Sequence, residues 1–172
     1  MDRMKNLLWL VTAIVLTGCF DKDARIINYG IADNVITQTE DRDDLISGER
    51  HLIETWSIKS TTTQIPNKIG TEFGVAYRVN NKTQAVTVDI EEVIIFPGDG
   101  LVNPSTGMRA TADAEVIEID PAVDQYFSYT LDYPWEAKPG TWIFQVKRDG
   151  EVLIEKSFML SKFLSRLLHF WF

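Results

Sequence analysis

The feature that most restricts the fold of this 172-residue chain is the alternation of apolar and polar residues along short segments. In the segment 139–160, Trp142, Phe144 and Val146 share one parity before an Asp-Gly pair, and a second alternating run follows that pair. Side chains of a strand point alternately to opposite faces, so each run predicts a strand with one buried face. Similar runs, separated by Gly, Asn, Asp and Pro, continue between residues 26 and 160. They predict an all-β fold of about seven or eight antiparallel strands in two packed sheets.

The Asp-Gly pair indicates the register of a C-terminal hairpin. A two-residue loop would place Phe144 opposite Glu155, which mixes the core and solvent faces. A three-residue loop over residues 148–150 instead places Val146 opposite Val152, with the final glycine at positive φ. We therefore predict the three-residue loop.

A second hairpin is expected where residues 73–79 and 86–90 alternate on either side of a turn at residues 80–82. Glu91 and Glu92 follow this run, and they interrupt its apolar phase. A bulge or a change of buried face is expected at that point.

The N-terminal segment 1–18 has the features of a secretory signal peptide. Arg3 and Lys5 make its start positive, residues 7–16 form an apolar core interrupted only by Thr12, and small residues follow. An apolar core of ten residues is shorter than the roughly 20 that a membrane-spanning helix needs. We expect this segment to be removed.

The signal ends in Leu16-Thr17-Gly18-Cys19, which resembles the lipobox of bacterial lipoproteins. The resemblance implies that Cys19 carries a diacylglycerol on its sulfur, that cleavage occurs before it, and that its new amine is acylated. Two or more acyl chains anchor a protein stably to a membrane, so residues 19–24 would form a lipidated N-terminus and short tether. Cys19 is the only cysteine of the chain.

The residue after the cysteine bears on the destination in the cell envelope. In enterobacterial lipoproteins an Asp at that position is an inner-membrane retention signal, and here the residue is Phe20. We expect an outer-membrane lipoprotein that faces the periplasm. Asp21, one position later, leaves the inner membrane open.

The charge of the mature chain excludes one class of partner. Removal of residues 1–18, which carry Asp2, Arg3 and Lys5 and hence a net charge of +1, changes the formal net charge from −8 to −9. The 154 residues that remain suit one domain. Binding to nucleic-acid phosphates needs concentrated Lys and Arg, so no nucleic-acid partner is expected.

Motifs for catalysis or for binding a metal or cofactor are absent from the sequence. There is no H-E-x-x-H, G-x-S-x-G, S-x-x-K or glycine-rich phosphate loop, so we expect no enzyme and no cofactor. The acids of residues 40–44 lack the order of a calcium loop and are expected in a solvated loop. The acidic residues between positions 113 and 120 fall on both faces of a predicted strand. His51 and His169 are distant in sequence and are expected in surface or capping roles, so no metal site is predicted.

The tail, residues 161–172, changes to helical spacing and predicts a short amphipathic helix. Its apolar stripe consists of Phe163, Leu164, Leu167, Leu168 and Trp171. The stripe would either pack on the sandwich or bind a membrane surface or partner.

Aromatic residues are concentrated between residues 126 and 135. Exposed aromatics on a sandwich can stack on sugar rings or contact a protein partner, whereas buried ones would pack in the core. The candidate interaction surface consists of Tyr126, Tyr129, Tyr133, Trp135 and Trp171.

The run TTTQIPNKIGTEFGVAYRV and the pattern PGTW…DG…L…F carry a resemblance across residues 25–160. They look like an uncharacterised family of exported bacterial domains with an immunoglobulin-like sandwich. The resemblance implies that fold for residues 25–160, and it implies no activity or catalytic residue.

Together these features predict a membrane-tethered, non-enzymatic binding or interaction module of the bacterial envelope, with the Cys19 lipid in the membrane and a protein as one candidate partner. The alternative is an immunity- or inhibitor-type lipoprotein that neutralises a basic envelope-active protein through its acidic surface.

Overall fold

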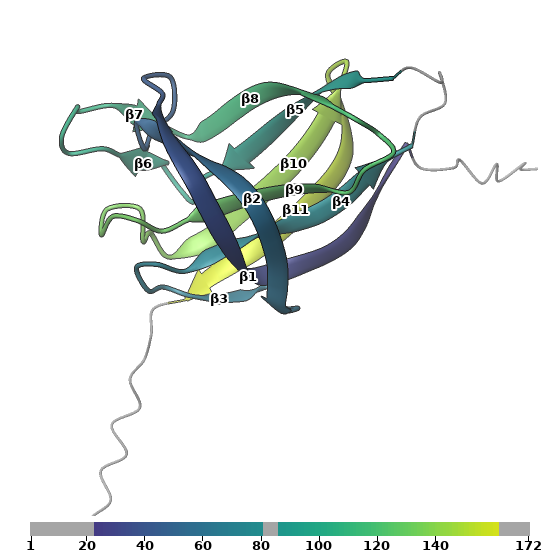
Figure 1. Cartoon of the computed structure of the whole chain (residues 1–172). Coiled ribbons are helices and arrows are strands. Elements are labelled where there is room, and N and C mark those ends of the chain that lie inside the picture. The colour runs from purple at the N-terminus through teal and green to yellow at the C-terminus, as the bar shows by residue number, and fades with distance from the viewer. Residues whose placement is uncertain (1–22, 81–85, 162–172) are drawn as a thin grey trace, which may run out of the picture.

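The computed structural model of the chain describes residues 23–80 and 86–161, and every regular element in these ranges is a β-strand (Figure 1). The predicted all-β class is therefore confirmed. The signal peptide, Cys19 and residues 162–172 of the predicted helix, which include Trp171, lie outside the described residues. Among the described residues there is no helix with the length and hydropathy needed to cross a bilayer.

Within the described residues, nine strands form two sheets, and two short strands form a separate ribbon. The four-stranded sheet has the order β2 (Glu49–Ser60), β1 (Ala24–Asp41), β4 (Glu72–Val79), β9 (Gln125–Thr130). The five-stranded sheet has the order β3 (Gln64–Pro66), β11 (Glu151–Ser161), β10 (Gly140–Arg148), β5 (Val88–Ile95), β8 (Ala112–Ile119). The ribbon pairs β6 (Leu101–Val102) with β7 (Arg109–Ala110). All pairs are antiparallel except β3 with β11, and eight of the strands in the described part have six residues or more.

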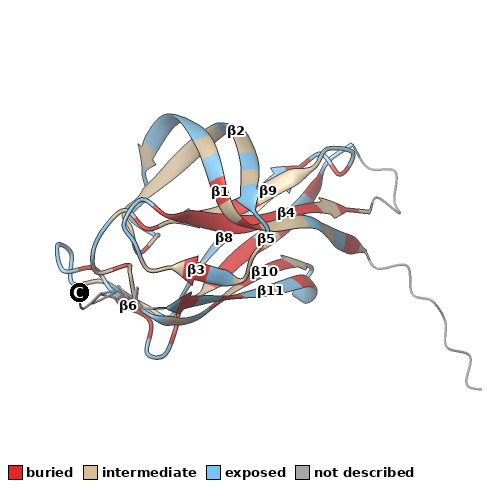
Figure 2. Cartoon of the chain, turned by 90° about the horizontal axis from the view of Figure 1, so that it is seen from below, coloured by how far each residue is buried: buried red, intermediate tan, exposed pale blue. Residues whose placement is uncertain are grey.

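The two sheets enclose one hydrophobic core (Figure 2). Phe73 of β4 lies at its centre, with ring centroids 5.7 Å from Trp142, 5.5 Å from Phe144 and 5.4 Å from Phe158, all at steep angles. Edge-to-face contacts of this kind add to the stability gained from burial alone. Trp142 is fully buried, and its indole Nε1 donates a hydrogen bond to the Lys138 carbonyl at 3.1 Å.

The β10–β11 hairpin has a different register from the predicted one. Its turn has two residues, Asp149 at φ 51° and Gly150 at φ 80°, and Val146 lies opposite Ile154. The prediction of Val146 opposite Val152 is therefore wrong, although the positive φ of the glycine is confirmed. Lys147 pairs with Val152 but Val146 pairs with Ile154, so Leu153 is the extra residue of a bulge. This bulge restores the buried face that the tight turn would otherwise disrupt. Val152, on the turn side of the bulge, is 43% exposed.

The predicted pairing of residues 73–79 with 86–90 is also wrong. Strand β4 belongs to the four-stranded sheet and β5 to the five-stranded sheet, so their buried faces oppose each other across the core. The predicted break at Glu91 and Glu92 does not occur, because β5 pairs with β8 without a register shift from Val88 to Ile95. Glu92 consequently takes a core-facing position of an unbroken strand and is 8% exposed.

The β1–β2 hairpin extends beyond the sheet that it belongs to. Residues 24–32 of β1 pair with β4, whereas residues 31–41 pair with β2, with several register shifts that bend the ribbon. Gly30, at φ 136°, allows this bend, because a Cβ there would lie 2.0 Å from the Ser60 carbonyl oxygen. Glu40 and Asp41 end β1, so the expectation of a solvated loop is wrong for these two residues.

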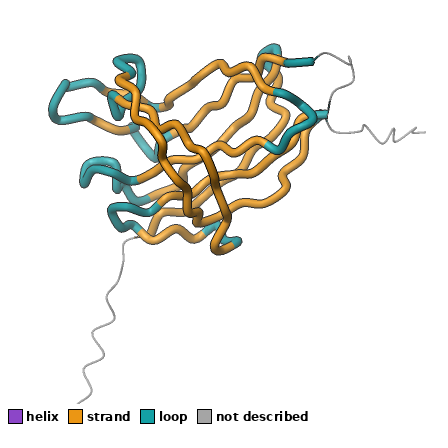
Figure 3. Tube along the Cα trace, viewed as in Figure 1, coloured by secondary structure: helices purple, strands orange, loops and turns teal. Residues whose placement is uncertain are grey.

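The tip of this hairpin, residues 42–48, covers the gap between the edge strands β8 and β9. Figure 3 shows it at the end of the sandwich where most of the loops gather. Ile46 inserts into the core with no exposed surface, and its carbonyl accepts a 2.9 Å hydrogen bond from Asn103 Nδ2. The tip therefore packs as part of the domain, and this packing creates the site described next.

Candidate functional site

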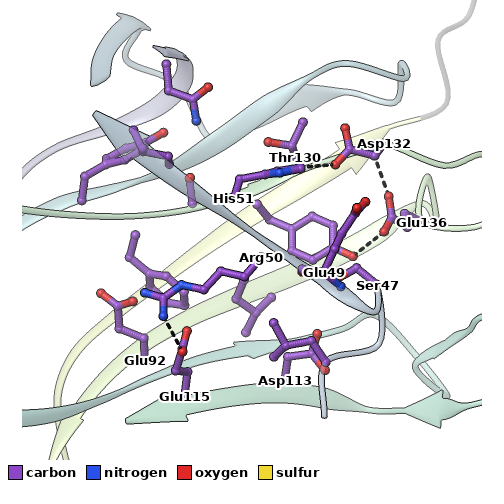
Figure 4. Close-up of a pocket in the computed structure, with 18 of the residues that line it drawn as sticks. Ser47, Glu49, Arg50, His51, Glu92, Asp113, Glu115, Thr130, Asp132 and Glu136 are labelled. Carbon is purple, nitrogen blue, oxygen red and sulfur yellow. Dashed lines mark hydrogen bonds and ion pairs between the residues drawn. The ribbon is translucent and has the colours of Figure 1, made fainter. Parts of the chain in front are cut away.

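A cavity of about 170 Å³ lies beneath the β1–β2 hairpin, between strands β8 and β9 (Figure 4). Residues from the hairpin, β5, β8, β9 and the loop after β9 line it. Six of the lining residues are carboxylic acids: Glu49, Glu92, Asp113, Glu115, Asp132 and Glu136. Arg50 and His51 are the only basic side chains among the described lining residues, so acids dominate the cavity.

Glu92 reaches the cavity from the core face of β5. Its Oε1 accepts a 2.6 Å hydrogen bond from the Tyr77 hydroxyl, which comes from the opposite sheet. Burial raises the pKa of Glu92 to about 7, against the opposing effects of the Tyr77 hydrogen bond and of Arg50. Near neutral pH this carboxyl is therefore present in both its protonated and its ionised form, and a nearby cation would favour the ionised form.

Asp113 and Glu115 reach the cavity from one face of β8. The two oxygens of Asp113 accept hydrogen bonds from the Ile46 backbone N–H at 3.1 and 3.2 Å, and burial raises the pKa of Asp113 to about 6. Glu115 Oε1 forms ion pairs with Arg50, at 2.7 Å, and with Arg42. These contacts tie the hairpin tip to β8. Glu118, at the other parity of this strand, is exposed, so the acids of residues 113–120 lie on both faces as expected.

The rim of the cavity carries a cluster of Glu49, His51 and Asp132. His51 Nε2 lies 3.0 Å from Asp132 Oδ2, and His51 Nδ1 lies 3.0 Å from the Thr39 hydroxyl. One potential ligand atom from each member of the cluster lies within 4.8 Å of the others. Glu49 and His51 are two residues apart on β2, so their side chains leave the strand on the same face.

Glu136 holds the loop that presents Asp132. Its Oε2 accepts hydrogen bonds from the backbone N–H groups of Asp132 and Tyr133 at 2.7 and 2.8 Å, and its Oε1 accepts one from the Tyr129 hydroxyl at 3.0 Å. Glu136 is 1% exposed, and burial raises its pKa. A buried carboxyl with three donors fixes a loop, so Glu136 has a positioning role here.

The structure brings four of the predicted interaction residues to this side of the molecule. Tyr126 and Tyr129 line the cavity. Tyr133 is 41% exposed, stacks on Trp135 at 5.9 Å, and donates a 3.2 Å hydrogen bond to Glu49 Oε1. Their role in binding stays a prediction, as does that of Trp171 and Cys19 outside the described residues.

The acids of the cavity were not singled out as a site from the sequence. They come from residues 49, 92, 113–115 and 132–136, which only the fold brings together. One signal was available: Glu92 shares the parity of the buried residues Val88 and Ile90, which indicates a core-facing acid.

Comparisons with known proteins agree with this fold. A family model described as a domain of unknown function, DUF3859, matches residues 21–160, and the chain belongs to that family. The structure is similar to that of an immunoglobulin-like protein from Pseudomonas aeruginosa, with a TM-score of 0.57 and 24% sequence identity over 81% of this chain and 97% of the other. That likeness supports the immunoglobulin-like sandwich predicted from the sequence. No curated protein matches the chain.

Proposed function

We propose that this member of the DUF3859 family is a lipid-anchored, non-enzymatic binding module of the bacterial envelope that takes a cationic group of its ligand into the acidic cavity. The observation that carries the proposal is the lining of the cavity, with six carboxylic acids against one arginine and one histidine. Arg50 already pairs with Glu115, so the remaining acids exceed the positive charge around them.

The size of the cavity limits what it can accept. Pockets for drug-sized ligands have volumes of about 300–1,000 Å³, and this cavity has about 170 Å³. It fits the end of a single side chain better than a whole small molecule. A lysine or arginine side chain of a protein or peptide partner supplies a positive group of that size, and Tyr126 and Tyr129 supply hydrophobic wall for its methylene groups.

The acids Glu92 and Asp113 suit such a ligand. Burial raises both pKa values, to about 7 and about 6, because an ionised carboxyl is costly in these positions. A cation placed beside them would remove this cost, so ligand binding and ionisation of the two acids would support each other.

The anchor and the cavity lie at opposite ends of strand β1. The proposed tether leads into Ala24, whereas the hairpin tip follows Asp41, and 17 residues of extended chain span as much as about 55 Å. Figure 1 shows β1 starting at one side of the sandwich and the β6–β7 ribbon lying beside the hairpin tip at the other. A lipid on Cys19 would therefore leave the cavity facing away from the membrane. In that orientation the cavity is accessible to periplasmic partners.

The test uses peptides of defined charge. Binding of tetra-lysine, tetra-arginine and tetra-glutamine peptides to the full chain in detergent is measured by calorimetry at two salt concentrations. We expect the two cationic peptides to bind, the neutral one not to bind, and the affinity to fall as salt rises.

Two double variants, each of which replaces one Glu and one Asp by the matching amide, make the test specific. Glu92→Gln with Asp113→Asn alters the cavity, whereas Glu54→Gln with Asp89→Asn alters two exposed acids elsewhere. The cavity variant should weaken binding at least about tenfold, as expected for the loss of partly buried charge pairs. The surface variant should change it less than about twofold. Equal effects of the two variants would mean that the peptides respond to overall charge and not to the cavity.

The same acidity favours the inhibitor-type alternative, in which the cationic group belongs to a basic envelope-active protein. An inhibitor lowers the activity of its partner when the two are mixed in equal amounts, whereas a simple binding module does not. The activity of a basic envelope protein that binds the chain, assayed with and without an equal amount of the full chain, separates the two functions.

A further inference from the structure

We propose that Glu49, His51 and Asp132 form a binding site for one divalent transition-metal ion, for which Zn²⁺ is the best chemical match. The site lies at the rim of the cavity, and its use does not depend on the cationic ligand proposed above. It joins the beginning of β2 to the loop after β9, which are the two sides of the cavity mouth.

The positions of the ligand atoms are close to those of a metal site. Zinc binds imidazole nitrogen and carboxylate oxygen at about 2.0–2.2 Å, so neighbouring ligand atoms of a tetrahedral site lie about 3.4 Å apart. The His51 Nε2 and Asp132 Oδ2 atoms are 3.0 Å apart, and all three groups fall within 4.8 Å of one another. Small side-chain rotations would therefore bring the third ligand, Glu49, into place.

The histidine is oriented as a metal ligand would be. Thr39 Oγ1 lies 3.0 Å from His51 Nδ1, on the side of the ring away from Asp132. A hydroxyl can donate or accept a hydrogen bond, so it supports either tautomer of the neutral ring. In the metal-free chain the 3.0 Å contact with Asp132 requires a proton on Nε2. A metal would displace that proton, the proton of the neutral ring would then lie on Nδ1 facing Thr39, and metal-binding histidines commonly have such an outer partner.

The two carboxylate ligands are also held from outside the cluster. The Tyr133 hydroxyl donates to Glu49 Oε1 at 3.2 Å. The backbone N–H of Asp132 donates to the buried Glu136 at 2.7 Å, which fixes the loop that carries this ligand. Each of the three ligands therefore has a neighbour that limits its movement, and this arrangement lowers the entropy lost when a metal binds.

The mixture of ligands selects the class of metal. Calcium and magnesium prefer all-oxygen sites, whereas imidazole suits zinc and other transition metals. Two carboxylates balance the two positive charges of the ion. Three protein ligands leave a fourth tetrahedral position, which a water molecule or a group of the ligand could fill.

The test measures metal binding to the full chain in detergent, after treatment with EDTA and removal of the chelator. Calorimetric titration with ZnCl₂ should give one ion per chain, and CaCl₂ should bind at least about 100-fold more weakly. His51→Gln and Asp132→Asn should each lower the Zn²⁺ affinity by more than about 100-fold, since loss of an outer partner alone costs about 10- to 100-fold. Thr39→Val should cost about tenfold.

The control variant is His169→Gln, which removes the other histidine of the chain and should leave Zn²⁺ binding unchanged. Circular dichroism without metal checks that each variant folds, and Glu49→Gln replaces any ligand variant that does not. Absence of Zn²⁺ binding by the unaltered chain, or binding that survives His51→Gln, would overturn the site. The Glu92→Gln, Asp113→Asn variant should bind Zn²⁺ normally, so failure of the cationic-ligand proposal would be seen separately.

Discussion

The hydroxyl of Tyr77 donates a 2.6 Å hydrogen bond to the carboxyl of Glu92, across the core from one sheet of the sandwich to the other. Both residues occupy inward-facing positions, and Glu92 stands where the alternation of β5 calls for an apolar side chain. The bond gives the buried carboxyl a partner, and the acid in turn reaches the cavity under the β1–β2 hairpin. A polar pair within the core thus links the packing of the fold to the candidate site.

The stability of the domain should depend on pH through Glu92. Its pKa is about 7 in the folded chain and 4.5 ordinarily, so between these values the folded chain holds a proton that the unfolded chain has lost. The free energy of unfolding should therefore fall as pH rises through this window, by up to about 3 kcal/mol.

Glu92→Gln isolates this effect, because glutamine can still accept the Tyr77 hydrogen bond but does not titrate. Relative to the unaltered mature chain, the variant should gain about 3 kcal/mol of stability between pH 4.5 and pH 8, measured by urea unfolding. Glu54→Gln, at an exposed position, should show no such gain. A Glu92→Gln chain that loses stability with pH as steeply as the unaltered one would contradict the assigned pKa.

Trp142→Ala should lower the free energy of unfolding by about 3–5 kcal/mol, because the indole is fully buried against Phe73 and Phe96 and the substitution leaves a cavity. Urea unfolding measures the change, and Thr141→Ala, at the exposed neighbouring position, is its control. A loss below about 1 kcal/mol would mean that the ring is not packed in the core.

Gly150→Ala should destabilise the chain by about 1–2 kcal/mol, since a residue with a Cβ is strained at φ 80°. Asp149→Asn should have little effect, because Asn-Gly is a favoured pair for a two-residue turn with positive φ at both positions. Chemical denaturation of the two variants compares them directly. If Asp149→Asn were the more damaging, the turn would not have the conformation described.

How much of the fold can be predicted depends on what the alternation of apolar and polar residues along a strand encodes. Trp142, Phe144 and Phe73 were assigned to buried faces correctly, because parity determines which side of a strand is apolar. Parity does not determine which sheet a strand joins, and for this reason β4 and β5 were paired wrongly. In the outer half of β1, residues 33–41, the only apolar residues are the adjacent Val35 and Ile36, which point to opposite faces, so no alternation of apolar and polar residues indicated the length of this strand.

The candidate site was less predictable than the fold. The aromatic residues Tyr126 and Tyr129 were identified from local composition, and the structure places both at the cavity. His51 and Asp132 are 81 residues apart, and no local pattern indicates that the curved β1–β2 hairpin brings them within 3.0 Å. Clusters of this kind depend on tertiary packing, which a single sequence does not reveal.

The anchor is tested at the cysteine. Cys19→Ala removes the thiol that the lipid would modify, so the variant should remain uncleaved after Gly18 and should incorporate no labelled palmitate. Membrane fractionation and mass spectrometry of the expressed protein measure both properties, with the unaltered chain as control. Palmitate on the variant would show that the lipobox interpretation is wrong.

The most direct measurement of the central claim is a carboxyl-detected ¹³C NMR titration of the mature chain with tetra-lysine at pH 6, where Glu92 and Asp113 are both still partly protonated. The side-chain carboxyl resonances of Glu92 and Asp113 should shift toward their ionised positions as the peptide binds, because a cation in the cavity lowers the pKa of both groups. Those of the exposed Glu54 and Asp89 should stay in place. Binding that moves the exposed resonances as much as those of the cavity, or leaves Glu92 and Asp113 unchanged, would contradict the account.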